Sequence, residues 1–263
     1  MWPSILCRCY NALSSLFISL YNIAYRDLFQ YYLRQRYSPT FLSVFINPFY
    51  FARKGLFKAI QSTANRLGMD VLDVGCGTSP YRSLIPHTSW RGLEIDTKEA
   101  RLRQLADDFY DGVHFPYPSH SFDSLLCNQV LEHVFTPQSF IEELFRVLKP
   151  GGTLLLTVPF IWDEHEQPFD YGRYTSFGLR SLLEAAGFII IEHRKIGTGA
   201  TVLFQLANAY AHKMLTGKSI SVRMCGVLLV IAPINLLGIL LIPILPVNQD
   251  LYLDHLIVAE RPL

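Results

Sequence analysis

The feature that most constrains this chain is an apolar run that ends in a glycine turn. Residues 71–78 read VLDVGCGT. The apolar residues around Asp73 predict a buried parallel strand, and Gly75 and Gly77 allow a tight turn where a Cβ would obstruct a ligand. Between residues 69 and 195, further short apolar runs alternate with helical patterns. That alternation is typical of βαβ units, so the sequence predicts an α/β fold with a parallel sheet.

The turn differs from the fingerprint of a dinucleotide site. That fingerprint reads G-x-G-x-x-G and places a pyrophosphate on a helix N-terminus. Here Pro80 occupies the third glycine position, and Asp73 brings a carboxylate to the end of the strand. A carboxylate at this point suits a cationic or zwitterionic ligand better than a pyrophosphate.

Five motifs in this order and spacing resemble the class I S-adenosylmethionine-dependent methyltransferases, and within them the type 11-like group. The motifs are DVGCG at 73–77, GLEID at 92–96, the segment from Asp111 to Asp123, LCNQVLEHV at 126–134 and VLKPGG at 147–152. The resemblance covers roughly residues 69–195 and the strand-like run 251–259. It implies a Rossmann-like, mostly parallel seven-stranded sheet with an antiparallel last strand, and S-adenosyl-L-methionine as cofactor.

The resemblance also implies where the cofactor lies. It places Asp73 near the methionine end, Glu94 on the ribose hydroxyls and Asp111 at the adenine amino group. The cofactor-binding candidates are Asp73, Gly75, Cys76, Gly77, Glu94, Ile95, Asp111, Gly112, Asn128, Gln129 and His133. The sequence leaves hardly any room for the usual second helix and a full third strand between Ile95 and Asp111. We therefore expect the adenine side to be open, or closed by the N-terminal region.

A second polar cluster, WDEHEQPFDYGRYT at 162–175, follows the fifth expected strand. In the family it resembles, this loop faces the transferred methyl group. Methyl transfer needs mainly positioning, but a hydroxyl acceptor benefits from a base, most often a histidine. We predict that His165 is this base, oriented by Glu166 or Asp170, and we include Arg173 in the catalytic group.

Purely structural interpretations of the same residues stay open. Arg173 would then simply pair with Asp170, and Thr175 or Ser176 would cap the helix expected over 176–186. His133 is a rival base, although a loop histidine packed beside the cofactor is its simpler interpretation.

Composition and residue spacing argue against several other classes of protein. The net charge of +1 gives no global basic field for nucleic acid. The other histidines are scattered without ligand spacing, so no metal site is predicted. The 5 cysteines match neither a disulfide framework nor a zinc motif.

Two apolar regions accompany the expected domain. Residues 1–48 form an apolar N-terminal extension that we expect to be helical, and residues 49–263 form the methyltransferase domain. That domain includes an apolar helical insert, 200–249, before the last strand. Residues 224–249 carry no charge, and Lys213, Lys218 and Arg223 precede them.

The insert is long enough to span a bilayer, but topology argues against a single crossing. It joins two strands that should pair in one sheet, and a two-helix hairpin would need ~40 apolar residues. Pro233, Gly238, Pro243 and Pro246 are expected to break it further. We therefore expect peripheral contact with the cytoplasmic face of a membrane; a lid packed on the domain is the alternative.

The leading functional hypothesis is S-adenosylmethionine-dependent O-methylation of a small or lipid-linked acceptor, such as a glycan or polyisoprenoid. One alternative is a non-catalytic, membrane-associated protein that binds the cofactor or a lipid. A NAD-dependent oxidoreductase is a weaker alternative, because Pro80 and Asp73 disfavour it. The sequence identifies neither the acceptor atom nor the oligomeric state.

Overall fold

The computed structural model describes residue 31 and residues 34–263. Residues 1–30, 32 and 33 lie outside this part. Most of the expected N-terminal extension, including Cys7, Cys9 and its expected membrane contact, therefore falls outside the described residues.

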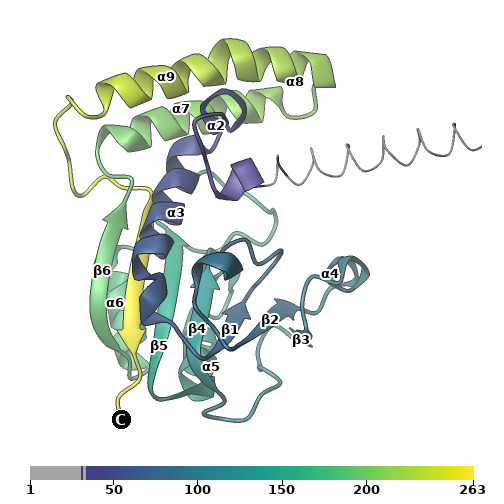
Figure 1. Ribbon diagram of the computed structural model, residues 1–263, viewed down its shortest axis with the longest axis vertical. Helices are drawn as coiled ribbons and strands as arrows, with labels where there is room; N and C mark the ends of the chain where they lie inside the picture. The colour runs from purple at the N-terminus through teal and green to yellow at the C-terminus, as the bar shows by residue number, and fades with distance from the viewer. Residues whose placement is uncertain (1–30, 32–33) are drawn as a thin grey trace, which may run out of the picture.

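A seven-stranded sheet organises the chain (Figure 1). Its strand order is β3-β2-β1-β4-β5-β7-β6. Neighbours among the first five strands pair in parallel, whereas β7 pairs antiparallel with both β5 and β6. The strands are β1 (Asp70–Val74), β2 (Ser89–Ile95), β3 (Asp108–Tyr110), β4 (Phe122–Asn128), β5 (Leu148–Pro159), β6 (Ile189–Ile196) and β7 (Asp254–Glu260). The expected mostly parallel sheet with an antiparallel last strand is confirmed.

Helices cover both faces of the sheet. Alternate residues of β1 enter different cores: Leu72 and Val74 pack in one cluster with α5 and α6, and Val71 packs in another with α3. Both faces are thus buried, which is why these strands read as nearly continuous apolar runs. The helices and helical turns up to α6 are α2 (Ser43–Ile46), α3 (Tyr50–Thr63), η1 (Ala64–Arg66), η2 (Arg82–Leu84), α4 (Lys98–Arg103), η3 (Leu131–His133), α5 (Pro137–Val147) and α6 (Ser176–Ala185).

The strand order reverses between β1 and β4. The chain builds β1, β2 and β3 toward one edge and then returns to place β4 on the other side of β1. In open α/β sheets, ligands bind outside the carboxyl ends of the strands at such a switch point. The loops after β1, β2, β3, β4 and β5 all leave this edge, so it is the place to examine for a site.

The segment between β2 and β3 is short but complete. It contains α4, of six residues, and β3, of three. The expectation that a second helix and third strand have little room is confirmed in their lengths, although both elements are present. The loop that carries Asp111 therefore still leaves the carboxyl end of a third strand.

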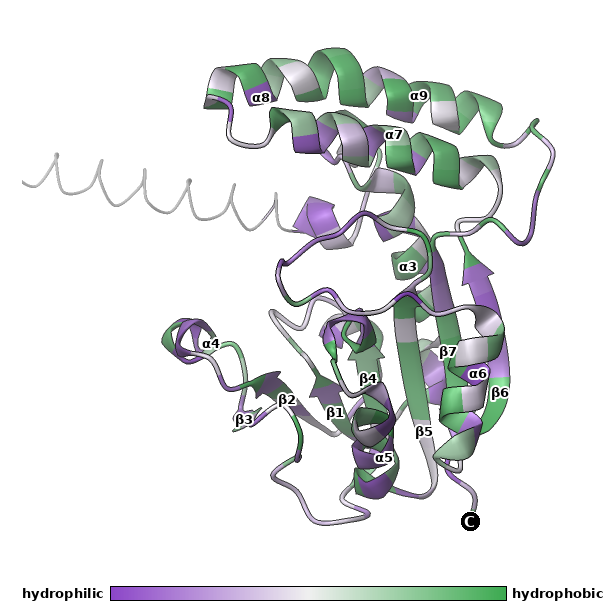
Figure 2. Cartoon of the chain, turned by 180° about the vertical axis from the view of Figure 1, so that it is seen from behind, coloured by the Kyte–Doolittle hydropathy of each residue, from purple (hydrophilic) through white to green (hydrophobic). Residues whose placement is uncertain are grey.

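An apolar helical unit stands above the carboxyl edge of the sheet (Figures 1 and 2). It consists of α7 (Ala200–Leu215), α8 (Ile220–Gly226), the π-helical segment η4 (Val227–Ile231) and α9 (Ala232–Leu241). Ile196 of β6 and Asp254 of β7 are register partners, so the insert leaves and rejoins the sheet at the same edge.

The expectation that prolines and glycines break the insert is wrong for Pro233 and Gly238. Residues 220–241 form one helix of 22 residues, long and apolar enough to cross a membrane by length and composition. Pro233 stands at the first turn of α9, just after η4. The wider turns of a π segment place the proline where its missing N–H and its ring are tolerated.

Buried amides attach the helical unit to the domain. Asn235 of α9 donates to the carbonyls of Val44 and Asn47 (2.8 and 3.2 Å) and accepts from Asn208 of α7 (2.8 Å). Gly238 packs against Phe51 of α3 so closely that a Cβ would lie 2.4 Å from its ring. One face of α9 is therefore fixed to the domain, while its other face remains exposed.

Candidate functional site

The glycine turn after β1 is held by the neighbouring strand. The N–H groups of Gly75 and Cys76 both donate to the carbonyl of Leu93 in β2 (2.8 and 3.2 Å). Gly75 has φ +65° and Gly77 has φ +50°, a region that disfavours any side chain. A Cβ at Gly75 would lie 2.4 Å from Val130, whereas one at Gly77 would meet nothing within 4 Å. Space at Gly75 is thus limited by the loop after β4, and Gly77 borders open space.

Asp73 and Cys76 are buried beside this turn. Burial raises the pKa of Asp73 to about 7, against the lowering effect of a hydrogen bond from the Ser79 hydroxyl (2.8 Å). The Cys76 thiol points to the carbonyl of Leu105 (3.3 Å), and burial raises its pKa to about 12. Cys76 can therefore serve a ligand only through its backbone.

Glu94 reaches from the end of β2 to the glycine turn. One carboxylate oxygen accepts from the Gly77 N–H (2.9 Å), and the other accepts from the Ile95 N–H (3.1 Å). The side chain of Ile95 is exposed next to it. This carboxylate therefore spans the gap between the first two strand ends, where the resemblance places the ribose.

Asp111 stabilises the turn after β3 through hydrogen bonds to its side chain. Its carboxylate accepts from the N–H groups of Val113 and His114 (2.8 and 2.7 Å), and these bonds lower its pKa. Gly112, with φ +91°, makes this turn possible. The carboxylate is exposed and already has two donors, so its fit to an adenine amino group remains a prediction.

Asn128 and Gln129 stand at the end of β4 and both contact Thr157 of β5. The Thr157 hydroxyl donates to Asn128 (2.8 Å), and the Gln129 N–H donates to the Thr157 carbonyl (3.0 Å). Gln129 has φ +57°, so the chain changes direction sharply there. These contacts orient the loop that carries Glu132 and His133.

The loop after β5 brings His165, Asp170 and Arg173 together. Arg173 makes two hydrogen bonds to the Asp170 carboxylate (2.6 and 2.7 Å). The same carboxylate accepts from the His165 N–H (3.0 Å) and lies 3.3 Å from His165 Nδ1. Burial raises the pKa of Asp170, but the bonds from Arg173 and His165 outweigh it and lower the pKa to about 2. Asp170 is thus ionised and placed to orient His165, and the simple pairing with Arg173 is present as well.

Thr175 caps the helix that follows this loop. Its hydroxyl accepts from the Gly178 N–H (3.1 Å) at the start of α6. Of the two residues considered for this cap, the structure selects Thr175. The cap fixes the end of the loop that begins after β5.

Glu132 belongs to the motif at 126–134, but the sequence did not indicate a role for it. Its side chain is fully buried, and within the described part of the chain neither carboxylate oxygen has a hydrogen-bond partner in another residue. Burial raises its pKa to about 8. Its backbone carbonyl accepts from Tyr171 and Gly172, which ties it to the loop after β5. A lone acid in the apolar stretch 130–134 was the signal for an unusual environment.

His133 and His165 meet beside this buried acid. Their ring centroids are 4.9 Å apart, and His133 Nε2 lies 3.8 Å from the nearer Glu132 oxygen. One ligand atom from each of Glu132, His133 and His165 lies within 4.8 Å of the others. The sequence set this pair apart from the scattered histidines, but it did not predict that their ligand atoms meet. Two residues adjacent in sequence meet a third from another loop, and sequence spacing could not reveal that.

The loop after β5 also contacts the apolar helical unit. Lys213 of α7 donates to the Asp163 carboxylate and to the Glu164 carbonyl (both 3.0 Å). Trp162 packs against Phe49 with ring centroids 5.8 Å apart. The segment that holds His165 is therefore joined directly to α7.

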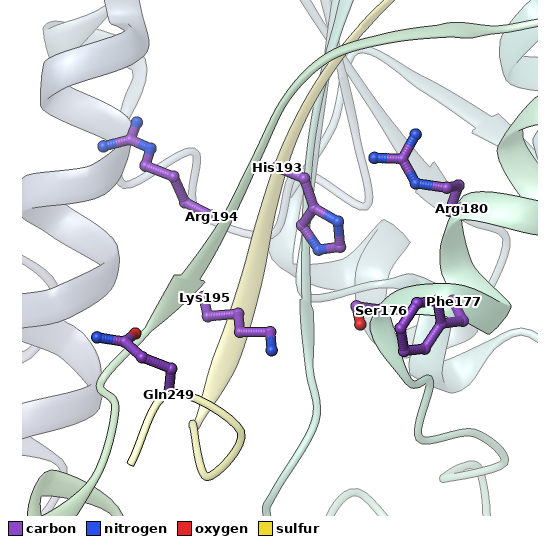
Figure 3. A pocket seen from close by; sticks show the side chains of 7 residues that line it. All are labelled: Ser176, Phe177, Arg180, His193, Arg194, Lys195 and Gln249. Carbon is purple, nitrogen blue, oxygen red and sulfur yellow. The ribbon is translucent and has the colours of Figure 1, made fainter. Parts of the chain in front are cut away.

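A separate pocket opens at the β6 edge of the sheet (Figure 3). It is lined by Ser176, Phe177, Arg180, His193, Arg194, Lys195 and Gln249. Its Arg and Lys side chains all have carboxylate partners: Arg180 with Glu184, Arg194 with Glu192 and Lys195 with Asp250. None of the residues expected in the site lines this pocket, and we assign it no part in the function below.

Comparison with solved structures defines the class of fold. The cyclase SpnF superposes with a TM-score of 0.51 and 23% identity, over 81% of this chain and 83% of that one. An S-adenosylmethionine-dependent methyltransferase from Mesorhizobium loti has a TM-score of 0.50 and 14% identity, over 79% and 98% of the two chains. At these identities the likeness shows the fold alone, a Rossmann-like α/β sheet of this type.

Sequence comparison adds the family. The model of the family described as "Methyltransferase domain" matches residues 72–156. A Mycolicibacterium smegmatis protein described as "Probable S-adenosylmethionine-dependent methyltransferase" is 33% identical over 154 residues, 53% of this chain and 60% of that protein. A demethylmenaquinone methyltransferase from Clavibacter sepedonicus is 26% identical over 183 residues, 54% and 75% of the two chains.

The matched segment runs from β1 into β5 and contains the glycine turn, Glu94, Asp111 and the loop after β4. Residues 72–156 therefore match the methyltransferase-domain family, within a Rossmann-like fold of the type that the solved structures share. The chain spans only 60% of the Mycolicibacterium relative and 24% of an Arabidopsis thaliana tRNA methyltransferase that it also matches.

Proposed function

We propose that this chain transfers a methyl group from S-adenosylmethionine to an acceptor held between the loops after β4 and β5. The observation that carries the proposal is the placement of Asp73, Glu94 and Asp111 at the carboxyl ends of three adjacent parallel strands, β1, β2 and β3. All three lie within the segment that matches the methyltransferase family.

The charges at this edge suit the cofactor. S-adenosylmethionine carries a sulfonium cation, an ammonium group and ribose hydroxyls. A carboxylate attracts the two cations and accepts hydrogen bonds from the hydroxyls. Glu94 lies closest to the glycine turn, through its bond with the Gly77 N–H. We assign Glu94 to the ribose, Asp73 to the methionine end, and the loop of Asn128, Gln129 and His133 to the cover over that end.

Catalysis in this proposal is assigned to the loop after β5. In-line methyl transfer needs mainly positioning, and a base helps when the nucleophile is a hydroxyl. His165 is the candidate base because the Asp170 carboxylate lies beside His165 Nδ1 and can orient the ring. Arg173 fixes this carboxylate in turn. The acceptor's reactive atom is then an oxygen.

A non-catalytic role is the second candidate. One of the structures with this fold is described as a cyclase, so the fold alone does not define the chemistry. The purified full chain should be incubated with methyl-tritiated S-adenosylmethionine and with cell extract divided into aqueous and lipid fractions. Transfer of label to one fraction supports the enzyme, whereas cofactor retained without any transfer supports the binding protein.

We further propose that the acceptor is lipid-linked and that the helical unit rests on a membrane. Figure 2 colours much of the helix from α8 to α9 as hydrophobic. Its exposed apolar residues include Leu229 (75% exposed) and Leu240 (68% exposed). The cations Lys218 and Arg223 are exposed at the α8 end of the unit, where they can meet anionic headgroups. Because Lys213 joins α7 to the loop of His165, an acceptor entering from the membrane would arrive beside that loop.

Vesicle flotation tests the membrane contact. Burial of apolar area in a bilayer is favourable by ~25 cal/mol per Å². The full chain should therefore float with phosphatidylcholine vesicles that contain phosphatidylglycerol, and detergent should release it better than salt. Replacing Leu229, Leu237 and Leu240 with Ser should reduce flotation. Leu102→Ser is the matched control, because Leu102 is 85% exposed on the distant helix α4. Equal flotation of both variants would exclude this surface as the contact.

A further inference from the structure

We propose that Glu132, His133 and His165 bind a divalent first-row transition metal ion, with Zn²⁺ as the expected type. The three residues come from two loops, η3 after β4 and the loop after β5, which meet at the carboxyl edge of the sheet. Their ligand atoms lie within 4.8 Å of one another.

The buried acid is the observation that points to a ligand. Glu132 is fully buried, and apart from its own backbone N–H no group in residues 34–263 donates a hydrogen bond to its carboxylate. A buried polar group without a partner is costly, and buried carboxylates are normally paired or bound to a metal. Arg173 is a cation close enough to lower the pKa of Glu132, but its two terminal nitrogens are engaged by Asp170, and its buried Nε makes no hydrogen bond within the described residues. A cation between Glu132 and the two imidazoles would satisfy the acid.

In both histidines the polar contacts engage Nδ1 and leave Nε2 available as a ligand. His133 Nδ1 lies 2.8 Å from the Phe169 carbonyl, which fixes the proton on Nδ1 and leaves the Nε2 lone pair free. His165 Nδ1 lies 3.2 Å from the Asp163 carbonyl and 3.3 Å from the Asp170 carboxylate, with the same result. Metal-binding histidines typically donate their other N–H to a carbonyl or carboxylate in this way. Asp170 thereby becomes a positioning residue for a metal ligand.

The donor set selects the type of ion. Two imidazole nitrogens and one carboxylate are a known zinc set in catalytic sites, which keep a further position open. Mg²⁺ and Ca²⁺ prefer oxygen ligands only. Tetrahedral zinc has bonds of about 2.0–2.2 Å and so needs ligand atoms roughly 3.3 Å apart. The side chains must therefore close together modestly on binding. Glu166, 3.8 Å from His133 Nε2 and exposed, can occupy the open position until an acceptor oxygen replaces it.

This site changes the assignment of His165. A metal-bound Nε2 cannot serve as the general base, and the ion would instead hold the acceptor oxygen and lower the pKa of its hydroxyl. That role rests on the proposed methyl transfer, whereas the binding of the ion does not. Chelation separates the two assignments: it leaves a base mechanism active and stops a metal-assisted one.

Optical titration with Co²⁺, a visible substitute for Zn²⁺, tests the site on the full chain. The titration is done without cofactor or acceptor, in a background with Cys7, Cys9 and Cys225 replaced by Ser to exclude thiolate ligands. One equivalent should bind and Zn²⁺ should displace it, while Mg²⁺ should not. His133→Ala and His165→Ala should abolish binding, and Asp170→Asn should weaken it 10–100-fold. His87→Ala, at the opposite end of the sheet, is the control and should bind normally.

A second measurement covers variants that fail to fold. Nitrogen-15 spectra of the wild-type histidines should show Zn²⁺ shifting Nε2 of two rings and leaving their Nδ1–H in place. Absence of Co²⁺ and Zn²⁺ binding to the background protein would overturn the proposal, as would unchanged binding in both histidine variants. Because S-adenosylmethionine binding is measured separately, failure here leaves the proposed methyl transfer untouched.

Discussion

The two halves of the carboxyl edge treat their acidic residues differently. On the cofactor half, Asp73, Glu94 and Asp111 all accept hydrogen bonds from neighbours in the chain. On the acceptor half, Glu132 has no partner in another residue for either oxygen and Asp254 has none for Oδ2, within the part of the chain that the structure describes. The acids of the first half are thus all hydrogen-bonded, although the buried Tyr81 hydroxyl after β1 has no partner within the described residues. The second half contains polar groups that remain to be satisfied.

This difference shows which part of the fold bears an energetic cost: the acceptor half, where buried acids lack hydrogen-bond partners. Local hydrogen bonds keep the cofactor loops in shape at little cost, whereas an unpaired buried acid costs stability and persists only if the rest of the fold supports it. We therefore expect substitutions in the cofactor half to damage binding. Neutral substitutions of the unpaired acids should instead stabilise the protein.

The largest effect should follow Gly75→Val in the cofactor half. The new side chain would strike Val130 and would have to adopt φ +65°, which costs about 1–2 kcal/mol before any clash. We expect calorimetry to show no S-adenosylmethionine binding and thermal unfolding to show a lower Tm. Gly217→Ala, in the turn between α7 and α8, is the control, because it places a side chain at φ +81° with nothing within 4 Å of its Cβ. If Gly75→Val binds the cofactor as wild type and the control do, the glycine turn is not the cofactor loop.

In the acceptor half, His165→Ala should separate chemistry from cofactor binding. Loss of a general base typically slows turnover by roughly 10²–10⁴-fold. Cofactor affinity should stay unchanged, because His165 lies on the loop after β5 and Glu94 on β2. Turnover is measured with whichever extract fraction accepts label, with His87→Ala alongside. A wild-type rate in the variant would exclude His165 both as base and as metal ligand for catalysis.

The buried acids should also make stability depend on pH, and Asp73 and Asp254 share one window because burial raises the pKa of each to about 7. Burial raises the pKa of Asp254 from 3.8 to about 7. Between those values the folded protein keeps a proton that the unfolded chain has lost, so stability falls as pH rises through this window. The shift corresponds to roughly 4 kcal/mol at most. Urea unfolding of wild type and Asp254→Asn at pH 4 to 7.5 should show a shallower decline in the variant. Parallel profiles would show that Asp254 does not titrate in this way.

The cofactor half could be predicted from the sequence because its motifs are local. A strand, a glycine turn and the next strand end lie within residues 71–96, so the order of motifs defines their place in the sheet. The same holds for α3, where Ala52, Leu56 and Ile60 share the buried face that their spacing predicts.

The acceptor half could not be predicted to the same depth, because its contacts join distant loops. His133 and His165 are separated by the whole of α5 and β5, and only the parallel pairing of β4 with β5 brings them together. The insert was misjudged for a different reason: proline spacing predicts a break, but η4 accommodates Pro233 within a continuous helix. Tertiary context decided both cases.

The most direct test of the account is calorimetric titration of the full chain with S-adenosylmethionine and, separately, with NAD. We predict one equivalent of S-adenosylmethionine bound and no NAD. Glu94→Gln keeps the shape of the side chain but removes its charge, and it should weaken S-adenosylmethionine binding roughly 10–100-fold, the range for hydrogen bonds to a charged group. Binding of NAD in place of S-adenosylmethionine, or equal S-adenosylmethionine affinity in wild type and Glu94→Gln, would contradict the assignment of this edge as the cofactor site.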